Sequence, residues 1–264
     1  MWRRVRIALK DYFTLTYDFN KMKTLYLLIS LIFSTFSTYS NQYPAEPIRI
    51  LVITGGHDYN AESFNEMLAS LGPGIKYQVA EFPAAYDMFL PVNRGRYDVL
   101  VFYHMWDKIT DDQAKMFVDC IKSGKPVVAL HHSLVAFESW PEYRDIIGGK
   151  YFLNPATVNG KVYSAGSYIH DLSLKVKIVN PNHPVTKGVG DFEIFDETYK
   201  GYYVADDVTP LLTTDEPTSE PVIGWAKKYG KSRIVVFQSG HDTPAYENPG
   251  YRKLLKQAIE WAGR

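Results

Sequence analysis

Residues 48–58 read Ile-Arg-Ile-Leu-Val-Ile-Thr-Gly-Gly-His-Asp and give the clearest indication of the fold. The run 48–53 is short and largely apolar on both faces, which is typical of a strand buried between two layers of helices. Gly55 and Gly56 allow the backbone to turn sharply after it. The pattern of residues 61–71 is helical. A buried strand, a glycine turn and a helix together predict the first unit of a parallel α/β sheet.

The rest of the chain repeats this alternation of strands and helices. We expect further core strands at residues 77–80, 98–102, 126–130 and 233–238, and helices at 111–123, 140–147 and 251–261. Thr110 is placed to cap the helix that follows it. Residues 150–230 are less regular, with strand-like pieces at 174–179 and 221–226, which predicts antiparallel additions and loops. The sequence therefore predicts one α/β domain over residues 45–264, with a doubly wound, mostly parallel, flavodoxin-like sheet and helices on both faces.

The composition is that of an ordinary globular protein and excludes several classes of function. Of the 264 residues, 46% are hydrophobic and 22% charged, and 29 Lys and Arg balance 29 Asp and Glu. This balance argues against a nucleic-acid-binding protein, which usually has a basic excess. The single cysteine, Cys120, cannot form an internal disulfide or a multi-thiolate metal site. The sequence has neither a glycine-rich dinucleotide loop nor a Lys-Ser/Thr phosphate loop, which disfavours nucleotide cofactors.

Residues 1–40 are expected to form an N-terminal extension and an export signal. Met22-Lys23-Thr24 precedes an apolar stretch at 25–33 and a segment rich in small hydroxyl residues at 34–40. A positive start, an apolar core and a small-residue exit are the three parts of a secretory signal peptide. We therefore expect Met22 to be the true first residue and the mature protein to be periplasmic or secreted. The apolar stretch is too short to span a bilayer, so no stable membrane insertion is expected after cleavage.

Most of the histidines follow the ends of predicted strands. Of the seven in the chain, the five found within four residues of such an end are His57, His104, His131, His132 and His241. His170 and His183 lie elsewhere. Because ligands bind beyond the carboxyl ends of parallel strands, we expect the five to converge on one site.

Carboxylates accompany these histidines. Asp58 and Asp242 each directly follow a histidine and can orient an imidazole ring. Asp196 and Glu197 follow an apolar piece at 192–195, where they either join the site or form a solvated turn. A carboxylate among imidazoles either binds a divalent metal or transfers protons, so a metal is allowed but not required. The candidate metal ligands are His57, His104, His132, His241 and Glu197, and no other cofactor is expected.

The aromatic side chains favour a carbohydrate ligand. They form 15% of the chain, and those that fall near predicted loops are Trp106, Trp140, Tyr199, Tyr202, Tyr203 and Trp225. Flat rings beside polar groups suit the apolar face and hydroxyl rim of a sugar. The alternative is that these rings fill the core.

The order of several short motifs resembles that of the ThuA-like (trehalose-utilisation) family. Matching segments include Ile-Thr-Gly-Gly-His-Asp-Tyr (53–59), Ala-Leu-His-His-Ser (129–133), Asp-Glu-Thr-Tyr (196–199) and Ser-Gly-His-Asp (239–242). The resemblance runs from about Ile48 to the C-terminus. It implies a class I glutamine-amidotransferase-like fold without that superfamily's catalytic cysteine, because His131-His132 stands at that position. We therefore do not expect a glutamine amidotransferase.

The resemblance also implies a small-molecule carbohydrate as substrate, either a disaccharide or its 3-keto-glycoside derivative. A ring ketone acidifies the adjacent C–H, so a base can remove that proton and the glycosidic group can leave; isomerisation would use the same groups. We expect His132 or Glu197 to be the base. His57, His104 and His241 would hold the carbonyl oxygen, directly or through a metal. The residues expected to bind the substrate are His104, Trp106, His131, Tyr199, Asp58 and Asp242.

Two other interpretations stay open. A non-catalytic periplasmic carbohydrate-binding protein would use the aromatic and polar groups without a coupled histidine–carboxylate pair. A hydrolase would use Ser133, which follows His131-His132, although the Gly-x-Ser-x-Gly frame is missing. The sequence leaves the oligomeric state open, and a homo-oligomer is allowed.

Overall fold

The computed structural model describes residues 46–264, so the predicted extension and export signal lie outside the described residues. The first elements in chain order are β1 (Ile48–Thr54), α2 (Ala61–Ser70), β2 (Ile75–Glu81), η1 (Ala84–Phe89), η2 (Arg94–Arg96), β3 (Val99–Phe102), α3 (Asp111–Lys122), β4 (Val127–Leu130), η3 (His131–Leu134) and α4 (Pro141–Ile147). The remaining elements are β5 (Gly149–Lys150), β6 (Ala156–Val158), β7 (Lys161–Tyr163), β8 (Ser167–Ile178), β9 (Phe192–Lys200), β10 (Tyr203–Val204), β11 (Thr209–Thr213), β12 (Val222–Tyr229), β13 (Ser232–Phe237), α5 (Thr243–Glu247) and α6 (Pro249–Gly263).

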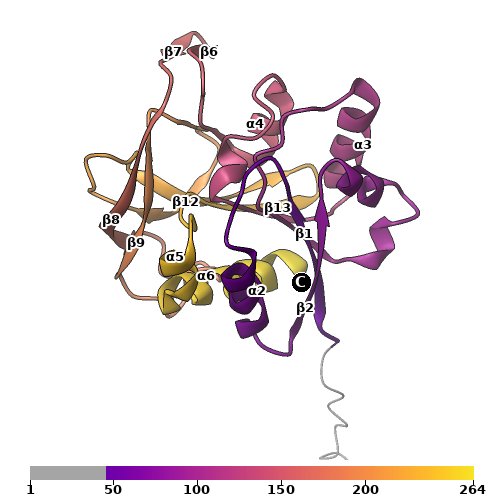
Figure 1. The fold of residues 1–264 in the computed structure, drawn as a ribbon, viewed down its shortest axis with the longest axis horizontal. Coiled ribbons are helices and arrows are strands. Elements are labelled where there is room, and N and C mark those ends of the chain that lie inside the picture. Colours follow the sequence, from indigo (N-terminus) through magenta and orange to yellow (C-terminus); the bar gives the residue numbers. More distant parts are fainter. Residues whose placement is uncertain (1–45) are drawn as a thin grey trace, which may run out of the picture. The chain divides into compact units, whose positions relative to one another are not determined.

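A nine-stranded sheet in the order β2-β1-β3-β4-β13-β12-β11-β8-β9 forms the centre of the described chain. The strands from β2 to β13 pair in parallel, and we call them the parallel half. The strands from β12 to β9 pair antiparallel, and we call them the antiparallel half. Helices α3 and α4 cover one face of the parallel half, while α2, α5 and α6 lie on the other (Figure 1). The predicted doubly wound α/β fold with a mostly parallel core is confirmed.

Strand β1 explains why two apolar cores form. Ile50 and Val52 face the core that contains α2 and α6, whereas Leu51 and Ile53 face the core that contains α3. Successive residues of a strand point to opposite faces, so a strand covered on both sides must be apolar throughout. All four side chains are at most 1% exposed. Each such burial contributes about 1.5–3 kcal/mol of transfer free energy.

Helix α3 begins where the sequence predicts. The Thr110 side chain accepts a hydrogen bond from the backbone N–H of Gln113, and the Gln113 side chain accepts one from the backbone N–H of Thr110. This reciprocal pair satisfies donors that the first turn of a helix leaves without partners. The predicted cap is therefore confirmed. Cys120 lies in the same helix and is buried in the core, where it packs as a small apolar residue.

The region 150–230 is more regular than predicted, because strands β6 to β12 all lie within it. Strand β8 starts at Ser167, so the predicted piece 174–179 covers only its second half. Strand β9 continues through Asp196 and Glu197, which are buried, so the alternative of a solvated turn is wrong. Tyr199 and Trp225 lie inside strands and are buried, which corrects their expected place near loops. The buried carboxylates break the apolar pattern by which strands are recognised.

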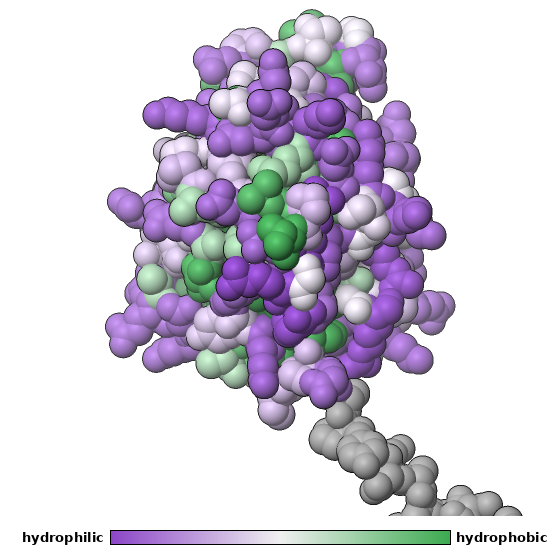
Figure 2. All heavy atoms as spheres, turned by 90° about the vertical axis from the view of Figure 1, so that its right-hand side faces the viewer, coloured by the Kyte–Doolittle hydropathy of each residue, from purple (hydrophilic) through white to green (hydrophobic). Residues whose placement is uncertain are grey.

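Two observations concern surfaces. Within residues 46–264, no helix combines the length and the apolar character that crossing a membrane requires. Figure 2 shows the side of the molecule on which α3 lies: it is mostly hydrophilic, and its apolar residues form small separate groups. A broad apolar surface therefore does not cover this side of the protein.

Candidate functional site

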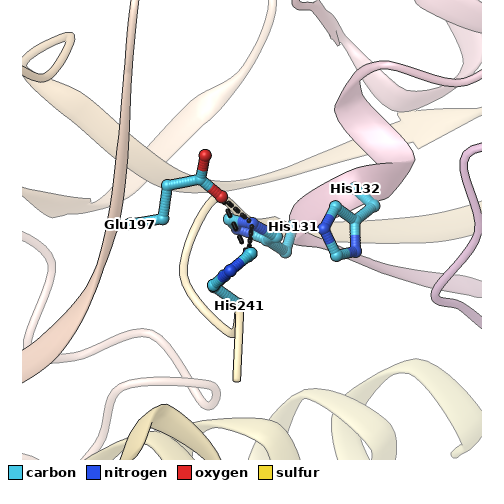
Figure 3. Close-up of side chains that lie close together, drawn as sticks. All are labelled: His131, His132, Glu197 and His241. Atoms are coloured by element: carbon cyan, nitrogen blue, oxygen red, sulfur yellow. Dashed lines mark hydrogen bonds and ion pairs between the residues drawn. The ribbon is translucent and has the colours of Figure 1, made fainter. Parts of the chain in front are cut away.

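The candidate site lies where loops from the carboxyl ends of the parallel strands face the edge strand β9. Gly55 and Gly56 follow β1 with φ values of 117° and 82°, which only glycine adopts freely, and they turn the chain towards His57. Helix η3 follows β4 directly and carries two further histidines. Glu197 reaches the same place from within β9 (Figure 3). Loops and a strand that are distant in sequence thus form one site.

His131 is held in one orientation. Its Nδ1 lies 2.5 Å from the backbone carbonyl oxygen of Gln238. A carbonyl only accepts, so Nδ1 must carry the hydrogen. The other ring nitrogen, Nε2, lies 2.9 Å from Glu197 Oε2, 3.0 Å from the Tyr199 hydroxyl and 3.2 Å from His241 Nδ1. The His131 backbone has φ 39°, a conformation that costs energy in a residue with a side chain and that recurs at functional sites.

Glu197 is tied to two imidazoles. Its Oε2 lies 2.9 Å from His131 Nε2 and 2.9 Å from His241 Nδ1. Burial raises the pKa of Glu197, but the hydrogen bonds with His131 and His241 outweigh it and lower the pKa to about 2. The hydrogen bond to Glu197 in turn raises the pKa of His241, although burial opposes it. The carboxylate is therefore ionised at neutral pH and stabilises positive charge on the His241 ring.

His132 has a different environment from its neighbour. It is buried, its Nε2 has no hydrogen-bond partner, and its ring stacks on that of His57 with 3.9 Å between centroids. Burial, followed by the proximity of the other histidines, lowers the pKa of His132 well below its ordinary value. A neutral imidazole with an unpartnered nitrogen can accept a proton or bind an electrophile.

These side chains open onto a pocket of about 290 Å³. Its lining residues are His57, Met105, His132, Val135, Tyr151, Leu153, Tyr168, His170, Glu197, Tyr199 and His241. The volume is near the lower end of the range for small-molecule pockets, which is about 300–1,000 Å³. A larger groove of about 520 Å³ runs beside α3, but no histidine lines it. The smaller pocket is therefore the candidate site.

Asp196 and Gln238 support the site from behind. The buried Asp196 carboxylate accepts hydrogen bonds from the backbone N–H groups of Gly240 (2.7 Å) and His241 (2.9 Å). The Gln238 side chain donates to the backbone carbonyl of Glu197 at 2.8 Å. Both contacts join β9 to the segment after β13. They fix the spacing between Glu197 and His241.

Several residues that the sequence singled out lie outside the pocket lining. His104 is 1% exposed and packs against Phe82, Phe102 and Phe137 in the aromatic core. Burial lowers its pKa to about 3, so it stays neutral. It follows β3 as predicted, but its ring points into the core and not towards the pocket.

Four further predicted substrate-binding residues are also absent from the lining, and one of them is His131, which contacts the lining residues Glu197 and His241. Trp106 packs on Phe82 with ring centroids 6.0 Å apart. Asp58 is exposed, and Asp242 is partly buried beside His241. Ser133, the nucleophile of the alternative hydrolase, is completely buried. Nothing in its position brings its hydroxyl to the pocket.

The sequence did not place His170 in the site. The β8–β9 register shifts by one residue between Ile169 and Leu172, which leaves His170 and Asp171 together opposite Glu197. Such a bulge redirects the side chains of the longer strand. His170 Nδ1 consequently lies 3.7 Å from Glu197 Oε1. A bulge has no reliable sequence signal, although Asp171, with φ 59°, is a residue type that tolerates this conformation.

Tyr151 and Tyr168 were also missed. Tyr168 pairs directly with Tyr199 across β8 and β9, so both rings lie on the same face. Tyr151 packs on Tyr199 with ring centroids 4.8 Å apart. The alternating Tyr-Ile-His of residues 168–170 is the signal that could have identified this wall, because alternate residues of a strand share a face.

Four of the described side chains could hold a metal ion. Each offers one ligand atom, all within 4.8 Å of one another, and they are His131, His132, Glu197 and His241. Of the five predicted candidate ligands, His57 and His104 are not in this group, and His131 joins it. Imidazole and carboxylate ligands of this kind suit zinc and other first-row transition metals.

Comparison with known proteins identifies a family. Residues 49–262 match the family model ThuA, described as trehalose utilisation. No protein with a curated description matches the chain. Among solved structures, a ThuA-like protein from Parabacteroides merdae shares 22% identity with a TM-score of 0.68, covering 83% of this chain and 90% of that one. A ThuA-like protein from Bacteroides uniformis shares 18% identity with a TM-score of 0.63, covering 85% and 95%.

A β-galactosidase from Bacillus circulans shares the fold over part of its length. Its identity is 11% and its TM-score 0.53, and the match covers 82% of this chain but only 31% of the enzyme. At these identities the likeness to each solved structure concerns the fold alone.

Proposed function

Because the chain belongs to the ThuA family, described as trehalose utilisation, we propose that it processes a carbohydrate in the pocket around Glu197. Two features of the pocket support this proposal. Three tyrosine rings line the pocket, and so do several titratable groups: His57, His132, His170, Glu197 and His241. Aromatic rings suit the apolar face of a sugar. The titratable groups can transfer protons to or from its hydroxyl groups and the carbon next to a carbonyl.

We propose as substrate a disaccharide that carries a ketone at ring carbon 3. Ketone formation acidifies the C–H at carbon 2, so a base of ordinary strength can remove that proton. The electron pair left on carbon 2 then forms a double bond to carbon 1 as the glycosidic oxygen leaves, and that oxygen takes up one proton. Atoms and electrons balance without an oxidant. Isomerisation through the same enediolate would use the same base.

His132 is the base in this proposal. The observation that carries it is the buried Nε2 of His132, which has no partner although it lies beside a cluster of paired groups. Glu197 is engaged by His131 and His241, which makes it a poorer base. His241 is partly exposed in the pocket and can donate a hydrogen bond to the developing oxyanion.

The test combines turnover with proton exchange. Trehalose, other disaccharides and their 3-keto derivatives are incubated with the protein, with and without a chelator, and the loss of the carbon 2 proton in D₂O is followed by NMR. We expect exchange and product only with the keto-glycosides. His132→Ala and the polar variant His132→Gln should lower both rates by about 10²–10⁴-fold, with substrate affinity changed only a few-fold.

The matched control is His183→Gln, which replaces a histidine outside the pocket lining and should leave both rates unchanged. Equal sugar affinity in all variants with neither exchange nor product would contradict the enzymatic proposal. It would favour the non-catalytic carbohydrate-binding protein instead.

We also propose that the protein is exported. This rests on the sequence alone, namely the basic start, apolar core and small-residue exit of residues 22–40. Mass spectrometry of the N-terminus of protein recovered from the periplasm or medium tests it. A chain that keeps residues 22–40 and stays in the cytoplasm would contradict it.

A further inference from the structure

We propose that the pocket binds one divalent first-row transition metal through His131 Nε2, Glu197 Oε2 and His241 Nδ1. These three atoms lie within 2.9–3.2 Å of one another. They come from three separate segments: the turn after β4, the middle of β9 and the loop after β13. Figure 3 shows the two rings and the carboxylate pointing towards a common point.

The spacing of the three atoms fits a metal centre. Zinc binds histidine nitrogen and carboxylate oxygen at about 2.0–2.2 Å, so two ligands of a tetrahedral site lie about 3.3 Å apart. The spacing in the structure is only a few tenths of an ångström shorter. Small rotations of the side chains would therefore complete the geometry.

The tautomer of His131 is the second argument. Its Nδ1–H is fixed by the carbonyl of Gln238, so the neutral ring presents a lone pair at Nε2. That lone pair faces the Glu197 carboxylate oxygen and Nδ1 of His241, which offers a second lone pair when His241 carries its hydrogen on Nε2. A carbonyl that orients a histidine in this way is the usual outer partner of a metal-binding imidazole. One cation would satisfy all three acceptors together.

The surrounding hydrogen bonds fix the remaining ligands. Asp196 holds the backbone N–H of His241, and the Gln238 side chain holds the backbone carbonyl of Glu197. Ligand-bearing segments are thus braced before any metal arrives, which lowers the cost of binding. The 46% exposed His170 lies 3.7 Å from the other oxygen of Glu197 and can steady the carboxylate from the pocket side.

Three protein ligands leave a coordination position open to the pocket. The side chain of His241 is 21% exposed and that of Glu197 is 5% exposed, so the cluster is reached from the cavity. A catalytic metal site characteristically keeps such a position for water or substrate. We assign His132 as a neighbour of the metal and not as a ligand, because its Nε2 forms no hydrogen bond, whereas the ligand atoms of the other three groups lie 2.9–3.2 Å apart. Two imidazoles and one carboxylate favour zinc, iron(II) or cobalt(II) over magnesium or calcium.

Metal binding is measured without any sugar, so this inference and the proposed function, whose pocket it shares, can fail separately. The purified protein is dialysed against EDTA and titrated with Zn²⁺ by calorimetry and with Co²⁺ by visible absorption. We expect one equivalent to bind and tetra- or pentacoordinate Co²⁺ bands to appear. Glu197→Gln and His241→Asn, which change little volume, should each lower the affinity by at least about 100-fold.

Two controls separate the alternatives. His183→Gln replaces a histidine outside the pocket lining. His132→Gln replaces the histidine that we place beside the metal without binding it. Both variants should still bind one equivalent of metal. Far-ultraviolet circular dichroism checks that each variant is folded. Wild-type protein that binds less than a tenth of an equivalent would overturn the inference. So would binding that survives Glu197→Gln and His241→Asn in folded protein, because the metal would then lie elsewhere.

Discussion

The two halves of the sheet contribute to the site in different ways. The inner strands of the parallel half are buried on both faces; they are β1, β3, β4 and β13. Their functional side chains stand on the loops that follow them, as His131 does after β4. The antiparallel half supplies Glu197 and Tyr199 from inside strand β9. A loop allows unusual backbone angles, whereas a strand holds a side chain rigidly. Glu197, the charged group that contacts the imidazole rings of His131 and His241, therefore comes from a strand of the antiparallel half and not from a loop.

The two halves meet where β12 pairs with β13, and a substitution there tests how strongly the halves depend on each other. Trp225 lies on β12, the first antiparallel strand, and is completely buried. Its Nε1 donates to the carbonyl of Ile147 at 2.8 Å. Gly149 packs so closely on the ring that an added Cβ would lie 2.5 Å from it. The indole thus joins β12 to the connection between α4 and β5.

Trp225→Ala is expected to have the largest effect on stability. The variant leaves a cavity at the junction and an unpartnered carbonyl, and buried tryptophan truncations cost about 3–5 kcal/mol of unfolding free energy. Urea denaturation measures the loss. Trp261→Ala, which truncates a partly buried indole on α6, is the matched control and should cost less. Equal losses in the two variants would mean that the junction is no more sensitive than the surface.

The same division explains what the sequence could predict. Runs such as 127–130 are apolar throughout, and four buried parallel strands were placed within a few residues of their observed bounds. The histidines that follow these strands were expected to converge, and His57, His132 and His241 do line one pocket. His104 does not, because the residue at the end of a short strand can point either into the core or towards the ligand.

The antiparallel half was harder to predict for physical reasons. Strand β9 carries Asp196 and Glu197 on buried positions, so its hydropathy pattern resembles a turn. Burying carboxylates is tolerated only when partners are present, and those partners come from segments more than 40 residues away. His170 depends on a bulge between two strands. Neither the partners of these carboxylates nor the bulge is determined by neighbouring residues in the sequence, so neither could be predicted from it.

Asp196→Asn tests whether strand β9 of the antiparallel half positions the loop after β13, which belongs to the parallel half. Both carboxylate oxygens accept backbone N–H groups, Oδ1 from His241 and Oδ2 from Gly240. An amide offers only one acceptor, so one donor would face another donor. We expect a loss of about 1–3 kcal/mol in unfolding free energy and a 10–100-fold weaker affinity for Zn²⁺.

The control for this prediction is Asp215→Asn. Asp215 is an exposed residue paired with Lys177, and the substitution should change stability by less than about 0.5 kcal/mol. Unchanged metal affinity and unchanged stability in Asp196→Asn would show that the loop after β13 holds His241 without help from β9.

Lys150 lies in β5, in the segment of chain that leads from the parallel half to the antiparallel half, and it provides a further test of how the two halves are joined. This buried residue of β5 donates to the carbonyls of Val135 and Ala136, at 2.7 Å each, and so braces the turn that follows the histidine pair. Burial lowers the pKa of Lys150 to about 8, although Glu138 opposes the shift. In the unfolded chain the amine keeps its ordinary pKa of 10.5. Between these values the unfolded state binds more protons than the folded state, so stability rises with pH.

We therefore expect the cost of burying the ammonium to be full below about pH 8 and to decrease as pH rises towards 10.5. Relative to Lys150→Met, which cannot titrate, the wild type should gain about 1–2 kcal/mol of unfolding free energy between pH 7.5 and 9.5. Urea denaturation of both proteins across this range measures the difference. A difference that stays constant or falls with pH would mean that Lys150 keeps its proton in the fold, and that an ionised Glu138 holds it as strongly as water does.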